Sequence, residues 1–211
     1  MNRKCFDIKA ALLKSGKEEF LLYGFERASL RAICKKANVT TGSFYAYFEN
    51  KEQLFNDILE PTLAEFYKMY SGVVQKAMAD VRNNESNELE AIEFLCEHRD
   101  NFRLLFDCSG GTRYAGFREY LLESIFINSY QKCFDKYAGR HVDPAVVRLF
   151  VQIKFTQYME LIYGGYTAEE IRHLISLYAS FTEAGFTKLI EQSKEEITEK
   201  DSRSETVGSL L

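Results

Sequence analysis

Apolar residues recur at intervals of three or four along most of this 211-residue chain. Such spacing gathers side chains on one face of an α-helix, whereas strict alternation would indicate strands. Only 2 residues are proline, so little interrupts the helical runs. The pattern therefore predicts an all-α protein.

The first run covers residues 6–23 and carries its apolar side chains four residues apart. This spacing predicts a helix that closes a small core. Gly24 follows and is of the residue type that most often ends a helix, because it adopts positive φ without strain. The stripe consists of Ile8, Leu12, Gly16 and Phe20.

Two shorter helices joined by a tight turn are expected between residues 29 and 47. Ser29 and Thr40 stand where an N-cap oxygen would accept free backbone N–H groups. Asn38 tolerates the positive φ that a helix-ending turn requires. The second helix, expected through Tyr47, has a small uncharged edge that suits insertion into a DNA major groove. That edge consists of Thr41, Gly42, Ser43 and Ala46.

This stretch resembles the N-terminal signature of the TetR family of bacterial transcriptional regulators over about residues 6–59. The family pattern contains a glycine–aromatic pair, a capped helix, A-G-V-(S/T)-x-G-(S/T)-(L/F/I)-Y-x-(H/Y)-F, and x-K-E. Three residues depart from it: Asn38 replaces the turn glycine, Gly16 a usual alanine, and Ala46 a frequent histidine. The matching residues are Phe20, Gly24, Phe25, Ser29, Ile33, Ala37, Val39, Thr40, Gly42, Ser43, Phe44, Tyr45, Tyr47, Phe48, Lys51 and Glu52.

The resemblance implies a helix-turn-helix DNA-binding domain at residues 1–50. A helix from residue 51 would link it to a helical-bundle effector-binding and dimerisation domain at 51–192. The implied function is that of a regulator, with a repressor favoured, which binds a palindromic double-stranded DNA operator as a homodimer and is released by a small-molecule effector. The DNA-contacting residues would be Ser29, Thr40, Thr41, Gly42, Ser43, Tyr45, Tyr47 and Lys51, with Thr41 and Ser43 at base edges or nearby backbone.

The charge distribution agrees with a nucleic-acid partner for the first domain. Residues 1–50 carry nine basic and five acidic residues, although the whole chain has a net charge of −4. A basic head on an acidic body is expected when one small domain meets phosphates and the rest stays away from them. Chance clustering of solvated charges is the alternative interpretation.

A further helix begins at Asn50, which forms a capping pattern with Gln53. Pro61 either bends this helix or starts the next one. A continuous kinked helix is favoured, because apolar spacing resumes after Pro61. Residues 80–88 are polar and predict a loop, whereas residues 193–211 lack core positions and predict a disordered tail.

The middle of the chain is rich in aromatic residues, most of which are expected to be core. A break at Gly110–Gly111 precedes a long helix predicted from Thr112 to Tyr137. Because helical bundles often bind ligands between helices, we expect a small apolar or aromatic effector to bind here and shift the helix at Pro61. The candidate pocket consists of Phe66, Tyr70, His98, Phe102, Phe106, Cys108, Arg113, Tyr114, Phe117 and Tyr130.

The last two long helices begin at Asp143–Pro144 and at a capping box, Thr167-x-x-Glu170. Their apolar surface exceeds what one core contact absorbs, which predicts a subunit interface; burial of both helices within one chain is the alternative. The family resemblance favours a dimer joined by a four-helix bundle. The interface candidates are Val147, Phe150, Ile153, Ile171, Leu174, Tyr178 and Phe181.

Other kinds of chemistry have little support in the sequence. The five cysteines lack a C-x-x-C pair, and the three histidines lie far apart, so neither a metal site, a cofactor nor a catalytic group is expected. No signal peptide or membrane-length apolar run is present, which favours the cytoplasm and no membrane partner. Two alternatives remain: an all-helical protein-interaction module, and a DNA-binding protein without an effector.

Overall fold

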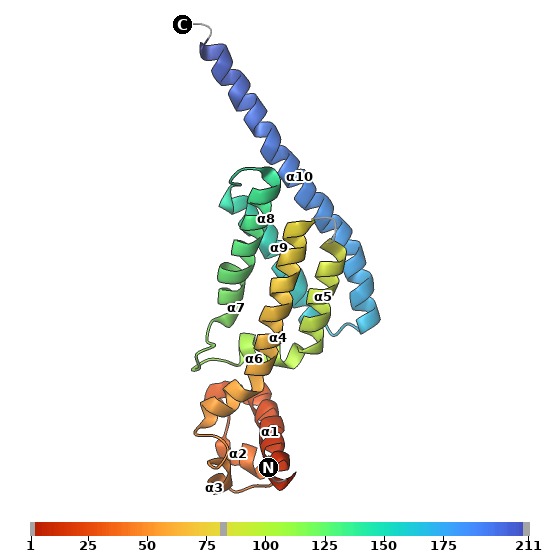
Figure 1. Ribbon diagram of the computed structural model, residues 1–211. Coiled ribbons are helices and arrows are strands. Elements are labelled where there is room, and N and C mark those ends of the chain that lie inside the picture. Colours follow the sequence, from red (N-terminus) through yellow and green to blue (C-terminus); the bar gives the residue numbers. More distant parts are fainter. Residues whose placement is uncertain (1–2, 81–83, 209–211) are drawn as a thin grey trace. The chain divides into compact units, whose positions relative to one another are not determined.

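The computed structural model describes residues 3–80 and 84–208, and all regular elements among these residues are helices (Figure 1). This confirms the all-α prediction. The residues whose side chains are outside the description are 1–7, 81–86 and 194–211.

The chain divides into two compact units. Unit 1 consists of Met1–Met69 and Glu97–Tyr120, and unit 2 consists of Tyr70–Cys96 and Leu121–Leu211. The sequence prediction separates the domains at residue 50. Unit 1 is larger than the predicted head, because residues 51–69 and 97–120 pack with the first three helices.

The first helix, α1 (Arg3–Arg27), is broken at Gly24. This residue has φ 72° and ψ 164°, a conformation essentially confined to glycine. The sequence places the helix end here, but the chain makes one more turn, in which the Ala28 N–H donates to the Gly24 carbonyl at 3.0 Å. Gly24 therefore ends the first helical segment, as the sequence predicts, and a further helical turn follows it within α1.

Gly16 sets how closely α1 approaches α4 (Lys51–Ala79). A Cβ added at Gly16 would lie 2.8 Å from Cδ2 of Leu54, a side chain with no exposed surface. Glycine in place of the alanine usual in the TetR pattern is therefore explained by the close approach of α1 and α4 at this position.

The two capped helices are confirmed as α2 (Leu30–Lys36) and α3 (Thr41–Phe44). Asn38 between them has the expected positive φ, 56°. α3 is shorter than the predicted helix through Tyr47. Its last turn tightens, because the Tyr47 N–H donates to the carbonyl three residues back at 2.9 Å.

α4 passes Pro61 without ending, which confirms the favoured interpretation of a continuous helix. Close to the proline, Asn101 of α6 (Arg99–Asp107) donates to Thr62 Oγ1 at 2.6 Å and to the Ile58 carbonyl at 3.4 Å. α7 (Phe117–Tyr120) completes unit 1. The side chains that close its core include Phe20, Phe44, Phe48, Phe55, Phe66 and Phe102.

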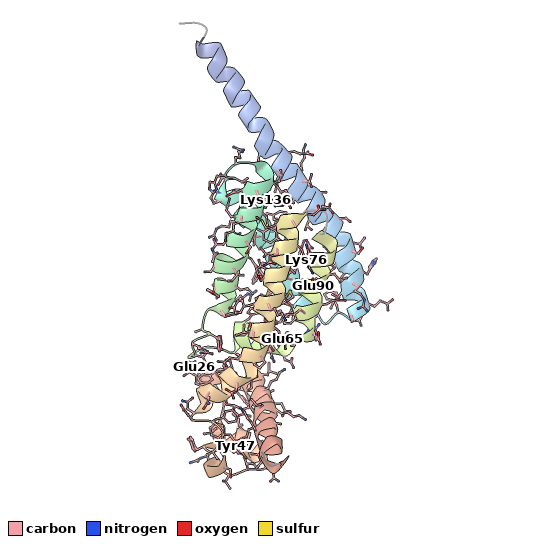
Figure 2. All side chains as sticks on the ribbon, viewed as in Figure 1. Glu26, Tyr47, Glu65, Lys76, Glu90 and Lys136 are labelled. Atoms are coloured by element: carbon pink, nitrogen blue, oxygen red, sulfur yellow. The ribbon has the colours of Figure 1, made fainter. Side chains whose placement is uncertain are left out.

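Unit 2 contains part of α4, α5 (Asn84–Glu97), and a π-helix η2 (Leu121–Ile127) that runs into α8 (Asn128–Ala138). Lys76 and Glu90 face one another from α4 and α5 at 2.5 Å (Figure 2). The predicted loop at 80–88 is wrong from residue 84 onward, because buried groups at 87 and 88 belong to α5.

The long helix predicted from Thr112 to Tyr137 is also corrected. It begins only at Phe117, after Gly116 with φ 76°. Residues 109–116 form turns, in which Ser109 Oγ donates to the carbonyls of Leu105 and Tyr114 at 2.8 and 3.0 Å. The spacing of the apolar residues is the same whether the helix starts at Thr112 or at Phe117. Periodicity alone therefore does not reveal where the helix begins.

Both predicted caps of the last helices are confirmed. In α9 (Pro144–Tyr163), Asp143 accepts from the Ala145 N–H. In the capping box of α10 (Ala168–Gly208), the Thr167 N–H donates to Glu170 Oε2 at 2.8 Å.

α10 has a helical backbone to Gly208, where the sequence predicts a disordered tail from residue 193. Lysine and glutamate favour the helical conformation even where they do not pack against a core. A segment without core positions can therefore still form a helix. Within the residues described, the helices are too short or too polar to cross a bilayer.

Candidate nucleic-acid interface

α3 exposes one edge while its opposite side is anchored in unit 1. Phe44 and Phe48 have exposed fractions of 0% and 1%, and their ring centroids lie 5.4 Å apart. Thr41 and Gly42 on the other side are exposed. Because the aromatic anchor is fully buried, the exposed edge is held in a defined orientation.

The cap of α3 is built from two hydroxyl groups. Thr40 Oγ1 accepts from the Ser43 N–H at 3.1 Å and shares a hydrogen bond of 2.9 Å with Ser43 Oγ. The Thr41 hydroxyl has no such bond within the described residues and is available for an outside partner. Of the two predicted base readers, Thr41 is therefore the freer and Ser43 the more constrained.

Tyrosines flank the exposed edge. Tyr45 is 59% exposed and meets the Phe44 ring edge-on at 5.4 Å. Tyr47 is half-buried in the same unit (Figure 2). A phenol that is exposed and held by its own ring contact can donate to a phosphate, which suits the predicted role of Tyr45.

Ser29 caps α2, with its Oγ accepting from the Ala32 N–H at 3.4 Å. Its own N–H donates to the buried Glu19 carboxylate at 3.3 Å, which also accepts from Lys36 at 3.1 Å. Ser29 is exposed, as its predicted phosphate contact requires.

Lys51 has a different environment from the one that the sequence predicts. Its ammonium donates to the carbonyls of Phe25, Glu26 and Ala28 at 2.6, 3.3 and 3.1 Å. It also lies 4.5 Å from the centroid of the Phe25 ring. Burial lowers the pKa of this lysine, although the nearby Glu26 opposes the shift. Lys51 closes the end of α1, and all three of its donors are used there.

Two exposed cations of α2, Arg31 and Lys35, are missing from the sequence prediction. They lie four residues apart, on the side away from the buried Ile33 and Cys34. The four-residue spacing of these two cations, on the face opposite the apolar residues, could have identified them from the sequence. By contrast, Lys9 is bound to Asp57 at 2.8 Å.

The residues of the predicted effector pocket are divided between the two units. In unit 1, Phe102 lies between Phe66 and Phe106, with centroids at 5.5 and 5.7 Å, and Phe106 stacks on Phe117 at 6.3 Å. Phe66 and Phe102 are 1% and 0% exposed, so they are core. Tyr114 is 9% exposed and belongs to the same core.

The polar members of that predicted pocket have local partners in unit 1. Arg113 donates to Glu60 at 2.5 Å and to the Tyr114 hydroxyl at 2.7 Å. These bonds raise the pKa of Arg113. His98 precedes α6 and lies 3.7 Å from Glu65, and the carbonyl of Cys108 accepts from the Phe25 N–H at 2.8 Å.

The other two predicted pocket residues, Tyr70 and Tyr130, lie in unit 2. Tyr70 contacts Phe126 at 5.1 Å between centroids and is hydrogen-bonded to Ser129. Tyr130 contacts Phe150 at 5.8 Å. Both tyrosines therefore belong to the packing of α4, α8 and α9 in unit 2.

The predicted subunit interface divides into exposed and buried positions of α9 and α10. Val147 and Ile171 are 0% and 3% exposed, which corrects their assignment to an interface and places them in the core of unit 2. Phe150 and Leu174 are half-buried. The exposed apolar residues of these helices are Leu149 at 63%, Ile153 at 55%, Tyr163 at 42%, Leu177 at 59%, Tyr178 at 45% and Phe181 at 63%.

Among the described residues, no group of three His, Cys, Asp or Glu side chains is arranged to hold a metal ion. The described cysteines 34, 96, 108 and 133 do not form disulfide bonds.

The segment that contains α2 and α3 matches a known family model. Residues 12–58 match the model described as bacterial regulatory proteins, tetR family. The matched segment covers most of α1, both short helices and the start of α4.

Curated relatives match over part of their length. The transcriptional regulator YdgC of Bacillus subtilis (strain 168) is 29% identical over 110 residues, which are 50% of this chain and 56% of that protein. UidR of Escherichia coli (strain K12), an HTH-type transcriptional regulator, is 33% identical over 69 residues, 31% of this chain and 35% of that protein. The chain thus spans about half of one relative and a third of the other.

The fold is shared over nearly the whole chain. The structure of NalD, the secondary repressor of the MexAB-OprM multidrug efflux pump in Pseudomonas aeruginosa, has a TM-score of 0.56 at 20% identity. The match covers 86% of this chain and 98% of NalD.

Proposed function

We propose that this chain, which belongs to the TetR family of bacterial regulatory proteins, is a transcriptional regulator that reads DNA with α3. The observation that carries the proposal is the exposed, uncharged edge of a short helix whose other side is anchored by Phe44 and Phe48. Small side chains on a fixed helix allow close approach to base edges in the major groove.

The proposed contacts fall into two groups, because phosphate contacts position a protein while base contacts specify sequence. Thr41 and Ser43 would meet base edges, with Gly42 allowing close approach. The groups assigned to phosphates are Ser29, Thr40, Tyr45, Tyr47, Arg31 and Lys35. Lys51 is assigned a positioning role, since its three donors hold the end of α1.

A two-fold dimer would give this regulator a palindromic operator. The exposed apolar residues of α9 and α10, among them Ile153 and Phe181, are the surface we assign to the partner subunit. Such exposed apolar side chains on neighbouring elements of the chain favour a helix–helix interface. Release by a small-molecule effector, and action as a repressor in the cytoplasm, complete the proposal.

Selection of bound sequences from random double-stranded DNA tests the proposal. We expect an inverted repeat whose half-sites lie one helical turn apart, about 34 Å, or a multiple of it. Thr41→Ala should relax the preference at particular bases, by about 1–3 kcal/mol for each lost contact. The exposed Thr187 of α10 provides the control, since Thr187→Ala should leave the selected sequence unchanged. Equal affinity of the wild type for selected and random DNA would exclude a specific regulator.

A further inference from the structure

A buried carboxylate joins α1 to α2 in unit 1. Glu19 of α1 is 3% exposed, and its two oxygens accept from the Ser29 N–H at 3.3 Å and from the Lys36 ammonium at 3.1 Å. In a capping box, the N–H of the N-cap residue donates to a glutamate three residues further on. That position of α2 is Ala32, so Glu19 supplies the carboxylate from another helix. Glu19 therefore binds α2 at its N-cap and at its last residue.

The two lysines that end α2 have different environments. Lys36 lies three residues after the buried Ile33, which places it on the side of α2 that meets α1. Lys35 lies on the opposite side and is exposed. The side chain of Lys36 keeps 38% of its surface exposed, although its ammonium is bound to Glu19. An ammonium released from Glu19 would therefore reach solvent.

A buried ion pair of unit 2 shows the contrast. Lys154 of α9 donates to Glu88 of α5, and their exposed fractions are 3% and 5%. Both partners are enclosed, so neither side chain is available to an outside partner. In the pair of Glu19 and Lys36 only the carboxylate is enclosed. The lysine of this pair is thus the member that could change partner.

The enclosed carboxylate opposes such a change. Removal of one partner from a buried ion pair is strongly destabilising, because an uncompensated charge is left behind. A DNA phosphate could bind Lys36 only by taking it from Glu19, and that exchange carries this cost. The exposed Lys35 meets a phosphate without it, and the release of counterions from DNA favours the contact.

We propose that Glu19 is a positioning residue of the helix-turn-helix, which withholds Lys36 from DNA phosphates while it holds α2 against α1. Phosphate contacts supply affinity that does not depend on sequence. A withheld lysine therefore weakens binding to random DNA. The inference rests on the proposed function, because it concerns the DNA contacts of α2.

Salt titrations of binding to random double-stranded DNA test the inference with the full chain. Lys36→Gln and Lys35→Gln make the same change at adjacent positions, and the new amide at position 36 can still donate to Glu19. We expect Lys35→Gln to reduce the steepness of log affinity against log salt by about 1, the value for one lost phosphate contact. Lys36→Gln should change it by less than about 0.5. A larger reduction for Lys36→Gln would overturn the inference.

Glu19→Gln should release the lysine. The amide has nearly the same size, but it carries no charge and its single oxygen cannot serve both donors. We expect the steepness to increase by about 1 and the affinity for random DNA to rise about two- to fivefold. Combination with Lys36→Gln should restore the wild-type steepness. Glu18→Gln removes the same charge from an exposed position of α1 and should change the steepness by less than about 0.5.

These measurements separate positioning from a merely structural role. A structural role alone would lower the fraction of folded protein in Glu19→Gln and leave the steepness unchanged, and that result would overturn the inference. Thermal unfolding shows which variants are folded at the temperature of the titration. If Glu19→Gln does not fold, the comparison of Lys36→Gln with Lys35→Gln still decides.

The two proposals fail separately, because the titrations use random DNA. The expected changes in a protein that selects no DNA sequence would reject the specific regulator and keep this inference. Sequence selection together with a reduced steepness for Lys36→Gln would keep the regulator and reject this inference. Absence of any DNA binding would reject both.

Discussion

At the residue scale, Gly16 controls the packing distance between α1 and α4. A Cβ there would lie 2.8 Å from buried Leu54. We expect Gly16→Ala to lower the free energy of unfolding by about 1–3 kcal/mol through overpacking. The helix propensity of alanine offsets about 1 kcal/mol of this cost, so the net loss should be at most about 2 kcal/mol. Denaturant unfolding measures both effects together.

Gly72 of α4 is the matched control, since no atom lies within 4 Å of its added Cβ. Gly72→Ala should raise the free energy of unfolding by about 0.5–1 kcal/mol. A stabilising Gly16→Ala would show that Leu54 can move and that the close approach is not required.

Lys51 and Lys35 should separate stability from DNA affinity. Lys51→Gln shortens the side chain and removes the ammonium that donates to the carbonyls of Phe25, Glu26 and Ala28, so we expect the free energy of unfolding to fall by about 1–3 kcal/mol. Lys35→Gln, at an exposed position, should leave stability within about 0.5 kcal/mol.

Salt titrations of DNA binding give the second measurement for the same two lysines. Lys35→Gln should reduce the slope of log affinity against log salt by about 1, the value for one lost phosphate contact. Lys51→Gln should leave the slope nearly unchanged. A reduced slope for Lys51→Gln together with an unchanged slope for Lys35→Gln would show that Lys51, and not Lys35, contacts a phosphate.

Sequence reasoning succeeded where the partner is local. The hydroxyls of Ser29, Thr40 and Thr167 bond to N–H groups three residues away, so spacing reveals them. The partners of Lys51 and Glu88 lie 23–26 and 66 residues away, which no periodicity encodes. Lys154 is the one lysine in the apolar sequence of α9, and this feature could have indicated a buried ion pair.

At the element scale, the sequence predicts where helices begin better than it predicts where they are interrupted. The capped starts of α9 and α10 are specified by side chains within one turn. The π-helix η2 and the turns before α7 depend on tertiary packing, while their apolar residues keep a helical spacing. The division of the candidate pocket residues between two units could not be predicted for the same reason, because an apolar stripe does not show which neighbouring element covers it.

The contact between α4 and α6 near Pro61 should be energetically coupled. Asn101 donates to Thr62 at 2.6 Å, and both side chains are buried. We expect Asn101→Ala and Thr62→Val each to lower the free energy of unfolding by about 1–3 kcal/mol. In a double-mutant cycle the two losses should differ from additivity by at least about 0.5 kcal/mol. Strict additivity would mean that this hydrogen bond contributes little in solution.

At the scale of the whole molecule, assembly should depend on the exposed apolar side chains of α9 and α10. Phe181→Glu would place a charge in the proposed interface, where desolvation is costly. We expect monomers in analytical sedimentation and weaker operator binding. Leu22→Glu on α1 is the control, because its 66% exposure matches the 63% of Phe181. A Phe181→Glu protein that stays dimeric would place the interface elsewhere.

The buried pair of Glu88 and Lys154 also restricts how this sequence can change over generations. Loss of one partner leaves an uncompensated charge at a cost of about 3–5 kcal/mol, a large part of a typical stability of about 5–15 kcal/mol. Loss of both is close to neutral. A lineage that abandons the pair must therefore pass through a poorly folded ancestor or change both positions nearly together. Descendants should accordingly inherit two charges or none at these positions.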